Sequence, residues 1–267
     1  MAGRGFRLFR DTVDALAPEA TGVRLGEAVY ALSSFCRDGS AAAPKPHSLN
    51  FEQAAAVPLA GLTAWQALFD HAQIEKGERV LIHGAAGGVG TYAVQLANWK
   101  GAEVIATASA KDHNFLSELG ASEVIDYAHE HFEEKVEDVD VVLDTVGGET
   151  QQRSWGVLRR GGILISIVSP VADEKAASLG LRGAFFIVEP NRAQLIQLGH
   201  LIDKGTLRVV VGAVLPLAEP ARLLSKDRPA ISAEKLCCKW LPPSPRSHSP
   251  LEPIPKHRSA LKLRATS

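Results

Sequence analysis

The segment Val80-Leu-Ile-His-Gly-Ala-Ala-Gly-Gly-Val-Gly90 decides the fold, because a short apolar run leads directly into a glycine-rich turn. The run predicts a strand, and the apolar spacing from Val89 to Lys100 predicts a helix directly after the turn. Glycines at such a turn let the backbone bend tightly and let a pyrophosphate approach the N-terminus of the helix. Gly87 and Gly90 match the last two glycines of G-x-G-x-x-G, whereas Ala85 replaces the first. The segment therefore predicts a dinucleotide-binding turn, with a methyltransferase-like fold as the main alternative.

Strands and helices alternate on both sides of this turn. Short apolar runs predict further strands at 104–108, 123–126, 139–144, 163–168 and 185–188, with one or two more at 207–217. Helices are predicted at 51–57, 61–72, 112–119 and 191–204, the first with Asn50 as its N-cap. Nearly continuous apolar strands between helices are typical of a parallel sheet covered on both faces. The predicted fold class is therefore α/β, a Rossmann-type doubly wound parallel sheet of six strands between about residues 50 and 205.

The C-terminal segment has a different composition from the rest of the chain. Residues 225–267 hold seven of the fifteen Pro and no Gly, with nine Lys or Arg against three Asp or Glu, a net charge of +6. The prolines of Leu241–Pro250 cannot continue a helix or donate to a sheet ladder. We therefore expect 225–267 to be a disordered tail. We interpret this composition as that of an unstructured chain end without a binding role, in preference to a basic arm that binds a partner.

The overall composition excludes several classes of protein. The 267 residues carry a net charge of −1, which argues against a nucleic-acid binder that depends on phosphate contacts. No apolar run approaches the ~18–20 residues that span a bilayer, so we expect no membrane segment. The three cysteines, Cys36, Cys237 and Cys238, include no Cys-x-x-Cys, and His129 and His131 lack a third ligand. The sequence thus predicts neither a disulfide framework nor a metal site, and it favours a cytoplasmic protein.

The end of the strand after the turn bears on the choice of cofactor. It reads Thr107-Ala-Ser-Ala-Lys111, without the carboxylate that would grip the ribose hydroxyls of NAD. A small polar residue and a lysine suit a 2′-phosphate instead. The alternative is that Lys111 only begins a solvated helix.

Three separated motifs, in order, resemble one known family. They are Ala54-Ala-Ala-Val-Pro-Leu-Ala-Gly-Leu-Thr-Ala-Trp65, the turn Gly84–Gly90, and Leu143-Asp-Thr-Val-Gly-Gly148. Together they are similar to the zinc-independent quinone oxidoreductase and enoyl reductase branch of the medium-chain dehydrogenases/reductases. The resemblance runs from about Asp14 to Leu223. It implies an NADPH-dependent reductase that transfers a hydride to a quinone or an α,β-unsaturated carbonyl without a metal.

The resemblance also implies which residues contact the cofactor. Those that would hold the pyrophosphate and the 2′-phosphate are Gly87, Gly88, Val89, Gly90, Ser109, Lys111 and Tyr127. Those that would border the nicotinamide half are Thr63, Thr145, Val146, Ile167, Val168, Ser169, Phe186 and Val188. For each apolar residue among them, the alternative explanation is that it only packs in the core of the sheet. No catalytic residue or proton donor is assigned, and His83 is expected to cap or pack rather than to catalyse.

The family fold joins a Rossmann domain to a GroES-like barrel that carries most of the substrate site. Here residues 49–224 match the Rossmann domain, whereas 1–48 resemble only a part of the barrel, with one clear strand at 26–34. We therefore expect an intact cofactor half and a substrate half cut from both ends. Two hypotheses follow: an NADPH-dependent reductase of a small carbonyl or quinone, or a catalytically silent dinucleotide-binding remnant or sensor. Uncovered apolar faces would favour a homo-oligomer.

Overall fold

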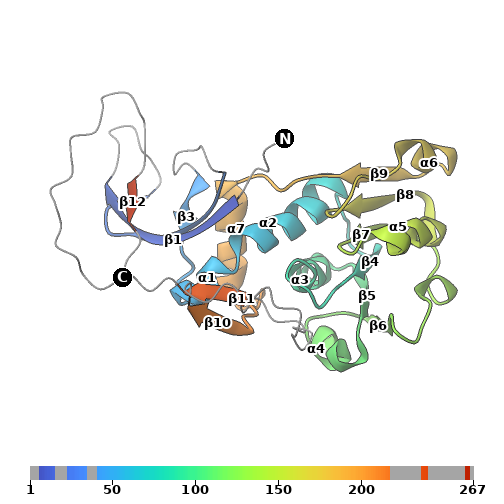
Figure 1. Cartoon of the computed structure of the whole chain (residues 1–267), viewed down its shortest axis with the longest axis horizontal. Helices are drawn as coiled ribbons and strands as arrows, with labels where there is room; N and C mark the ends of the chain where they lie inside the picture. Colours follow the sequence, from blue (N-terminus) through green and yellow to red (C-terminus); the bar gives the residue numbers. More distant parts are fainter. Residues whose placement is uncertain (1–5, 16–22, 35–40, 217–235, 240–261, 265–267) are drawn as a thin grey trace.

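The computed structural model describes residues 6–15, 23–34, 41–216, 236–239 and 262–264. Its centre is a six-stranded sheet in the order β6-β5-β4-β7-β8-β9, with every neighbouring pair parallel (Figure 1). The strands are β4 (Arg79–His83), β5 (Glu103–Ala108), β6 (Glu123–Asp126), β7 (Val139–Asp144), β8 (Leu158–Ser166) and β9 (Arg182–Phe185). The predicted doubly wound sheet is confirmed.

Two of the strands predicted for the parallel sheet differ from the structure by more than one residue. The strand expected at 163–168 begins earlier, at Leu158, and ends at Ser166. The strand expected at 185–188 lies at Arg182–Phe185, so the apolar run that follows Phe185 lies beyond the sheet edge. Val188 in that run is buried in the core, which explains its apolar character without a place in the sheet.

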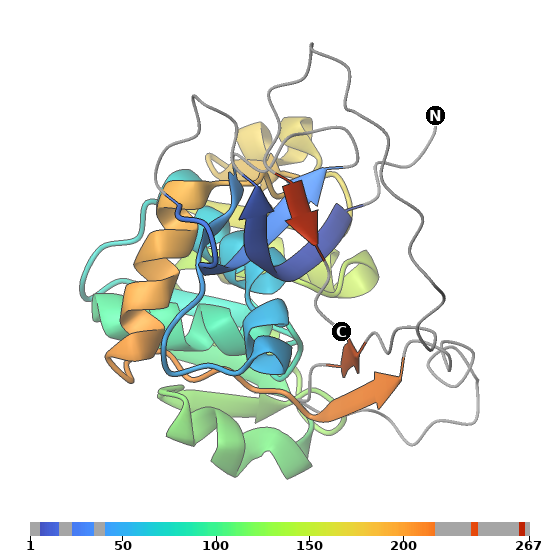
Figure 2. The same ribbon diagram turned by 90° about the vertical axis from the view of Figure 1, so that its left-hand side faces the viewer.

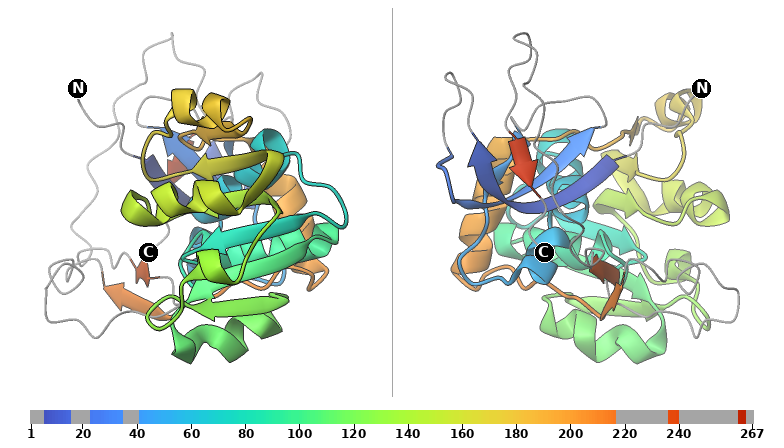
Figure 3. Two further views of the ribbon diagram at one scale, coloured as in Figure 1. Left: turned by 90° about the vertical axis from the view of Figure 1, so that its right-hand side faces the viewer. Right: turned by 60° about the vertical axis from the view of Figure 1, so that its left-hand side comes forward.

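Helices cover both faces of the sheet. Successive side chains of each strand point to opposite faces, so each face has apolar residues to bury. Val80 and Ile82 belong to a core shared with α2 (Pro58–Trp65), α3 (Gly90–Lys100), α4 (His113–Glu118) and α7 (Arg192–Asp203). Leu81 belongs to a second core with residues near α5 (Gly148–Ser154) and α6 (Asp173–Ser178). Figure 1 shows α3 and α5 on opposite sides of the strands, and Figure 3 shows the same layers from the sheet side.

The helix boundaries follow local capping chemistry. The predicted N-cap Asn50 begins α1 (Phe51–Ala55) and forms a capping box with Gln53. Gly101 ends α3 in the left-handed conformation, with φ of 86°. Helix α2 continues as a π-helical turn, η2 (Gln66–His71). Short 3-10 turns are η3 (Ala110–Asp112), η4 (Phe132–Glu134) and η5 (Trp155–Val157).

A second, antiparallel sheet lies beside α7 (Figure 2). Its order is β12-β1-β2-β3, formed by β12 (Lys262–Arg264), β1 (Phe6–Ala15), β2 (Ala28–Ser34) and β3 (Ala43–Pro44). The buried Tyr30 hydroxyl joins this sheet to α7, because it donates to the Leu195 carbonyl at 2.5 Å. The domain boundary at residues 48 and 49 stays a prediction.

The predicted tail lies mostly outside the described residues. Within 225–267, the structure describes only β11 (Leu236–Lys239), which pairs in parallel with β10 (Ala213–Pro216), and β12. In the part of the chain that the structure describes, no helix has the length and apolar character needed to cross a membrane.

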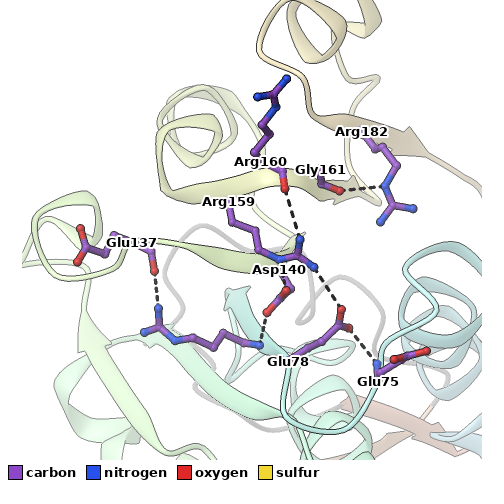
Figure 4. Close-up of polar contacts among 9 residues, drawn as sticks. Glu75, Glu78, Glu137, Asp140, Arg159, Arg160, Gly161 and Arg182 are labelled. Carbon is purple, nitrogen blue, oxygen red and sulfur yellow. Dashed lines mark hydrogen bonds and ion pairs between the residues drawn. The ribbon is translucent and has the colours of Figure 1, made fainter.

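Ion pairs and hydrogen bonds tie the amino ends of the strands together (Figure 4). Asp140 accepts a hydrogen bond from the Arg79 backbone amide at 2.7 Å and also pairs with Arg159. The Arg159 guanidinium lies 3.7 Å from a Glu78 carboxylate oxygen. This network joins β4, β7 and β8 at the end of the sheet opposite to the glycine turn.

Candidate cofactor site

The glycine turn lies at the carboxyl edge of the sheet, where the strand order reverses between β4 and β7. Open parallel sheets bind ligands in the crevice at such a point. The loops after these two strands touch: Thr145 donates its hydroxyl to the His83 carbonyl at 2.7 Å. A Cβ on Gly84, whose φ is +63°, would lie 2.5 Å from the Thr145 hydroxyl oxygen. Glycine is therefore required for this close approach.

The turn itself brings together the four residues expected at a pyrophosphate. The Gly87 amide donates to the Gly84 carbonyl at 2.9 Å, and both Gly87 and Gly88 are exposed. A Cβ on Gly90 would lie 2.5 Å from two carbonyl oxygens of the turn, so only glycine lets α3 begin this close to β4. No side chain caps α3 at Val89. An uncapped helix N-terminus behind exposed glycines suits an anion.

His83 supports the turn from inside the fold. Its ring is fully buried, with Nδ1 3.1 Å from the Thr107 hydroxyl and Nε2 2.9 Å from the Ser154 hydroxyl. Ser154 donates its own hydrogen to the Thr150 carbonyl at 2.6 Å, so Nε2–H of His83 must donate to Ser154. Burial lowers the pKa of His83 to about 4, against an opposing effect of Asp144. The ring is therefore neutral at pH 7 and bridges β4, β5 and α5.

The residues expected at a 2′-phosphate follow β5 and β6. The register pairs Ala108 with Asp126, and the Tyr127 amide donates to the Ala108 carbonyl at 3.2 Å, so Tyr127 and Ser109 follow the ends of neighbouring strands. Lys111 and Tyr127 are exposed, the latter by 66%.

Ser109 differs from its expected role as a free donor. Its hydroxyl already donates to the Asp112 carboxylate at 2.8 Å. Asp112 is buried, and nothing but its place at a helix start distinguishes it in the sequence.

The loops after β7 and β8 carry most of the residues expected beside the nicotinamide. Val146 and Val168 are 52% and 50% exposed, and each lies two residues after the buried end of its strand. Ile167 is half-buried. Between the two loops lies the fully buried Asp144, which the sequence reasoning missed. A carboxylate at the end of an otherwise apolar strand was the available signal.

Three residues expected at the site make no observed contact with these two loops. Thr63 is buried in α2 and donates its hydroxyl to the Leu59 carbonyl of its own helix at 2.7 Å. The Phe186 ring packs 4.4 Å from the His71 ring, and Val188 is in the core.

Gln66 is a further residue of this region that the sequence analysis did not identify. It fixes the segment after Val188, because its amide group exchanges two hydrogen bonds with the Glu189 backbone, at 2.8 and 3.0 Å.

Comparison with known proteins gives consistent matches. Residues 119–222 match the family described as zinc-binding dehydrogenase. A probable zinc-binding mitochondrial oxidoreductase from Arthroderma benhamiae is 33% identical over 231 residues, which covers 76% of this chain and 70% of that protein. Among solved structures, the quinone oxidoreductase of Coxiella burnetii superposes with a TM-score of 0.77 at 32% identity, over 89% of this chain and 79% of that one. The Escherichia coli quinone oxidoreductase complexed with NADPH gives 0.73 at 28% identity, over 86% and 81%.

Two of these descriptions mention zinc. Within the described ranges, no three His, Cys, Asp or Glu side chains are grouped so that they could hold a metal ion.

Proposed function

Because the chain belongs to the quinone oxidoreductase and enoyl reductase branch of the medium-chain dehydrogenase/reductase superfamily, we propose that it uses NADPH to reduce a quinone or an α,β-unsaturated carbonyl. The observation that carries the proposal is the exposed Gly87-Gly88 pair in front of the uncapped α3, in a turn that begins where His83 and Gly84 contact the loop after β7. The neighbouring family members are oxidoreductases, and one of them is a quinone oxidoreductase complexed with NADPH.

Bound NADPH would supply the hydride from its nicotinamide C4. In this proposal the turn Gly87 to Gly90 binds the pyrophosphate at the N-terminus of α3, while Lys111 and Tyr127 bind the 2′-phosphate. The Gly87 amide itself already donates to the Gly84 carbonyl. The loops at 145–146 and 167–169 border the ring and exclude water from it. The contribution of the protein is then positioning, and no metal ligand is among the proposed site residues.

The preference for NADPH over NADH rests on Lys111. Lys111 is exposed and lies in η3, directly after β5, and the residues that end β5 include no carboxylate. A charge-assisted hydrogen bond contributes roughly 1.5–3 kcal/mol, and ~1.4 kcal/mol is tenfold in affinity. The Ser109 hydroxyl is engaged by Asp112, so it contributes as a donor only after that bond breaks.

Lys111→Ala tests this assignment. We expect NADPH binding, followed by cofactor fluorescence, to weaken by about ten- to a hundredfold, with NADH binding nearly unchanged. Lys100→Ala is the matched control, because Lys100 is an exposed lysine at the opposite end of α3. Equal losses for the two cofactors, or an effect as small as that of the control, would contradict the assignment.

The same protein can be assayed for NADPH oxidation with a panel of quinones and enones. Turnover supports a reductase. Tight NADPH binding without oxidation by any acceptor would instead favour the alternative, a dinucleotide-binding protein without reductase activity.

A further inference from the structure

A single buried carboxylate connects the two loops that the proposed function places beside the nicotinamide. Asp144 ends β7 and is fully buried. Its Oδ1 accepts hydrogen bonds from the backbone amides of Val146 and Gly147, at 2.9 and 2.7 Å. This half of the carboxylate fixes the loop after β7.

The other oxygen reaches the loop after β8. Asp144 Oδ2 accepts from the Ser166 hydroxyl at 2.9 Å and from Gln151 Nε2 at 3.1 Å. The Ser166 oxygen in turn accepts from the amides of Val168 and Ser169, at 3.2 and 3.3 Å. Four loop amides are thus held, directly or through one hydroxyl, by one side chain.

The two loops also touch each other. A Cβ on Gly147 would lie 3.3 Å from a Val168 methyl and 3.6 Å from the Ser169 hydroxyl. Gly147 has φ of +78°, so its backbone adopts this approach without the strain that a side chain would bring. A shift of one loop therefore changes the space that is open to the other.

The chemistry of these bonds requires a carboxylate. The side-chain oxygens of Asp144 meet only donors, and a carboxylate side chain offers two acceptor oxygens where asparagine offers one. Asparagine keeps one acceptor for the two amides, but its NH₂ group would face the donors of Gln151 and Ser166. If Ser166 turned to accept from that group, its oxygen would have three donors around it, and the bonds to Val168 and Ser169 would weaken.

We propose that Asp144 is a positioning residue that couples the two loops, so that Val146 and Val168 present one fixed apolar surface to the nicotinamide. The coupling follows from the hydrogen bonds, while the role toward the nicotinamide rests on the proposed function. A coupled pair of loops fixes the distance and angle of hydride transfer. It contributes little to binding of the cofactor phosphates, which lie at the other part of the proposed site.

Hydrogen exchange of the ligand-free protein tests the coupling. In Asp144→Asn we expect the amides of residues 146, 147, 168 and 169 to exchange at least tenfold faster, while the β4 and β5 amides keep their rates. Ser166→Ala should accelerate only 168 and 169. Asp140→Asn, a change at the other end of β7 that leaves one acceptor oxygen for the Arg79 amide and the Arg159 guanidinium together, is the matched control and should leave both loops unchanged. Release of only one loop by Asp144→Asn, or of both by the control, would overturn the coupling.

Kinetics test the role toward the nicotinamide. We expect Asp144→Asn and Ser166→Ala to lower kcat for quinone reduction at least tenfold and to change the Kd for NADPH less than threefold, with Asp140→Asn close to the wild type. A parallel loss of NADPH affinity, or an unchanged kcat in both variants, would overturn the positioning role. Failure of the wild type to bind NADPH would instead refute the proposed function, and the exchange rates would still decide the coupling. Ser166→Ala keeps the test decisive if Asp144→Asn does not fold.

Discussion

Buried His83 should make the stability of this protein sensitive to acid. Its pKa is about 4 in the fold and about 6.5 when unfolded, because burial disfavours the charged ring. Both ring nitrogens also have partners that fit the neutral form. A depressed histidine pKa contributes stability that is complete above pH 6.5 and is lost as the pH falls toward 4. The loss amounts to about 2 kcal/mol at pH 5 and about 3 kcal/mol in full.

The assay is urea unfolding of the wild type and of His83→Gln, between pH 7.5 and 5. Carboxylates titrate in the same range, so the quantity to follow is the difference between the two proteins at each pH. Glutamine carries no titrating group, and we expect the advantage of the wild type to shrink by about 2 kcal/mol on going to pH 5. A difference that stays constant with pH would refute the reasoning.

His129→Gln is the control for that experiment. The His129 ring is exposed, and its hydrogen bond to Asp126 raises its pKa. A raised histidine pKa contributes stability that is lost as the pH rises, so this variant should move in the opposite direction.

Two further substitutions test the turn and the contact between the antiparallel sheet and α7. Gly90→Ala should weaken NADPH binding more than tenfold and lower stability by about 1–3 kcal/mol, because the new Cβ would lie 2.5 Å from two carbonyl oxygens. Gly156→Ala, where a Cβ meets nothing within 4 Å, is its control in thermal unfolding and cofactor titration, and equal effects would contradict the steric argument. Tyr30→Phe removes the buried bond to Leu195 and should cost about 1 kcal/mol in urea unfolding without changing NADPH affinity. No measurable loss of stability would show that this bond does not help to hold the antiparallel sheet on α7.

Most of the parallel sheet could be predicted because its strands carry their own local signal. Val80–His83 and Val139–Asp144 are short apolar runs with turns on both sides, and Asn50 and Gly101 mark helix ends by capping chemistry. The edge strand β9 was misplaced by three residues. Three of its four residues, Arg182, Gly183 and Ala184, are polar or small, while Phe186 and Val188 after it pack in the core.

The candidate site was predicted less completely than the sheet. The glycine turn is contiguous in sequence, so its four residues could be found together. The bonds from Asp144 to Ser166, and from Ser109 to Asp112, depend on which hydroxyl faces which carboxylate. Composition and periodicity carry no such information. The exchange between Gln66 and the Glu189 backbone joins residues 123 positions apart, and it follows only from the tertiary fold.

The exposed valines at the carboxyl edge have a thermodynamic consequence. Val146 and Val168 keep about half of their surface in water in the ligand-free chain. A nicotinamide seated between them, as proposed, would remove that apolar surface from water, and such burial lowers the heat capacity of the complex. The enthalpy of cofactor binding then becomes more favourable with rising temperature, and a calorimetric value at one temperature describes this site only at that temperature.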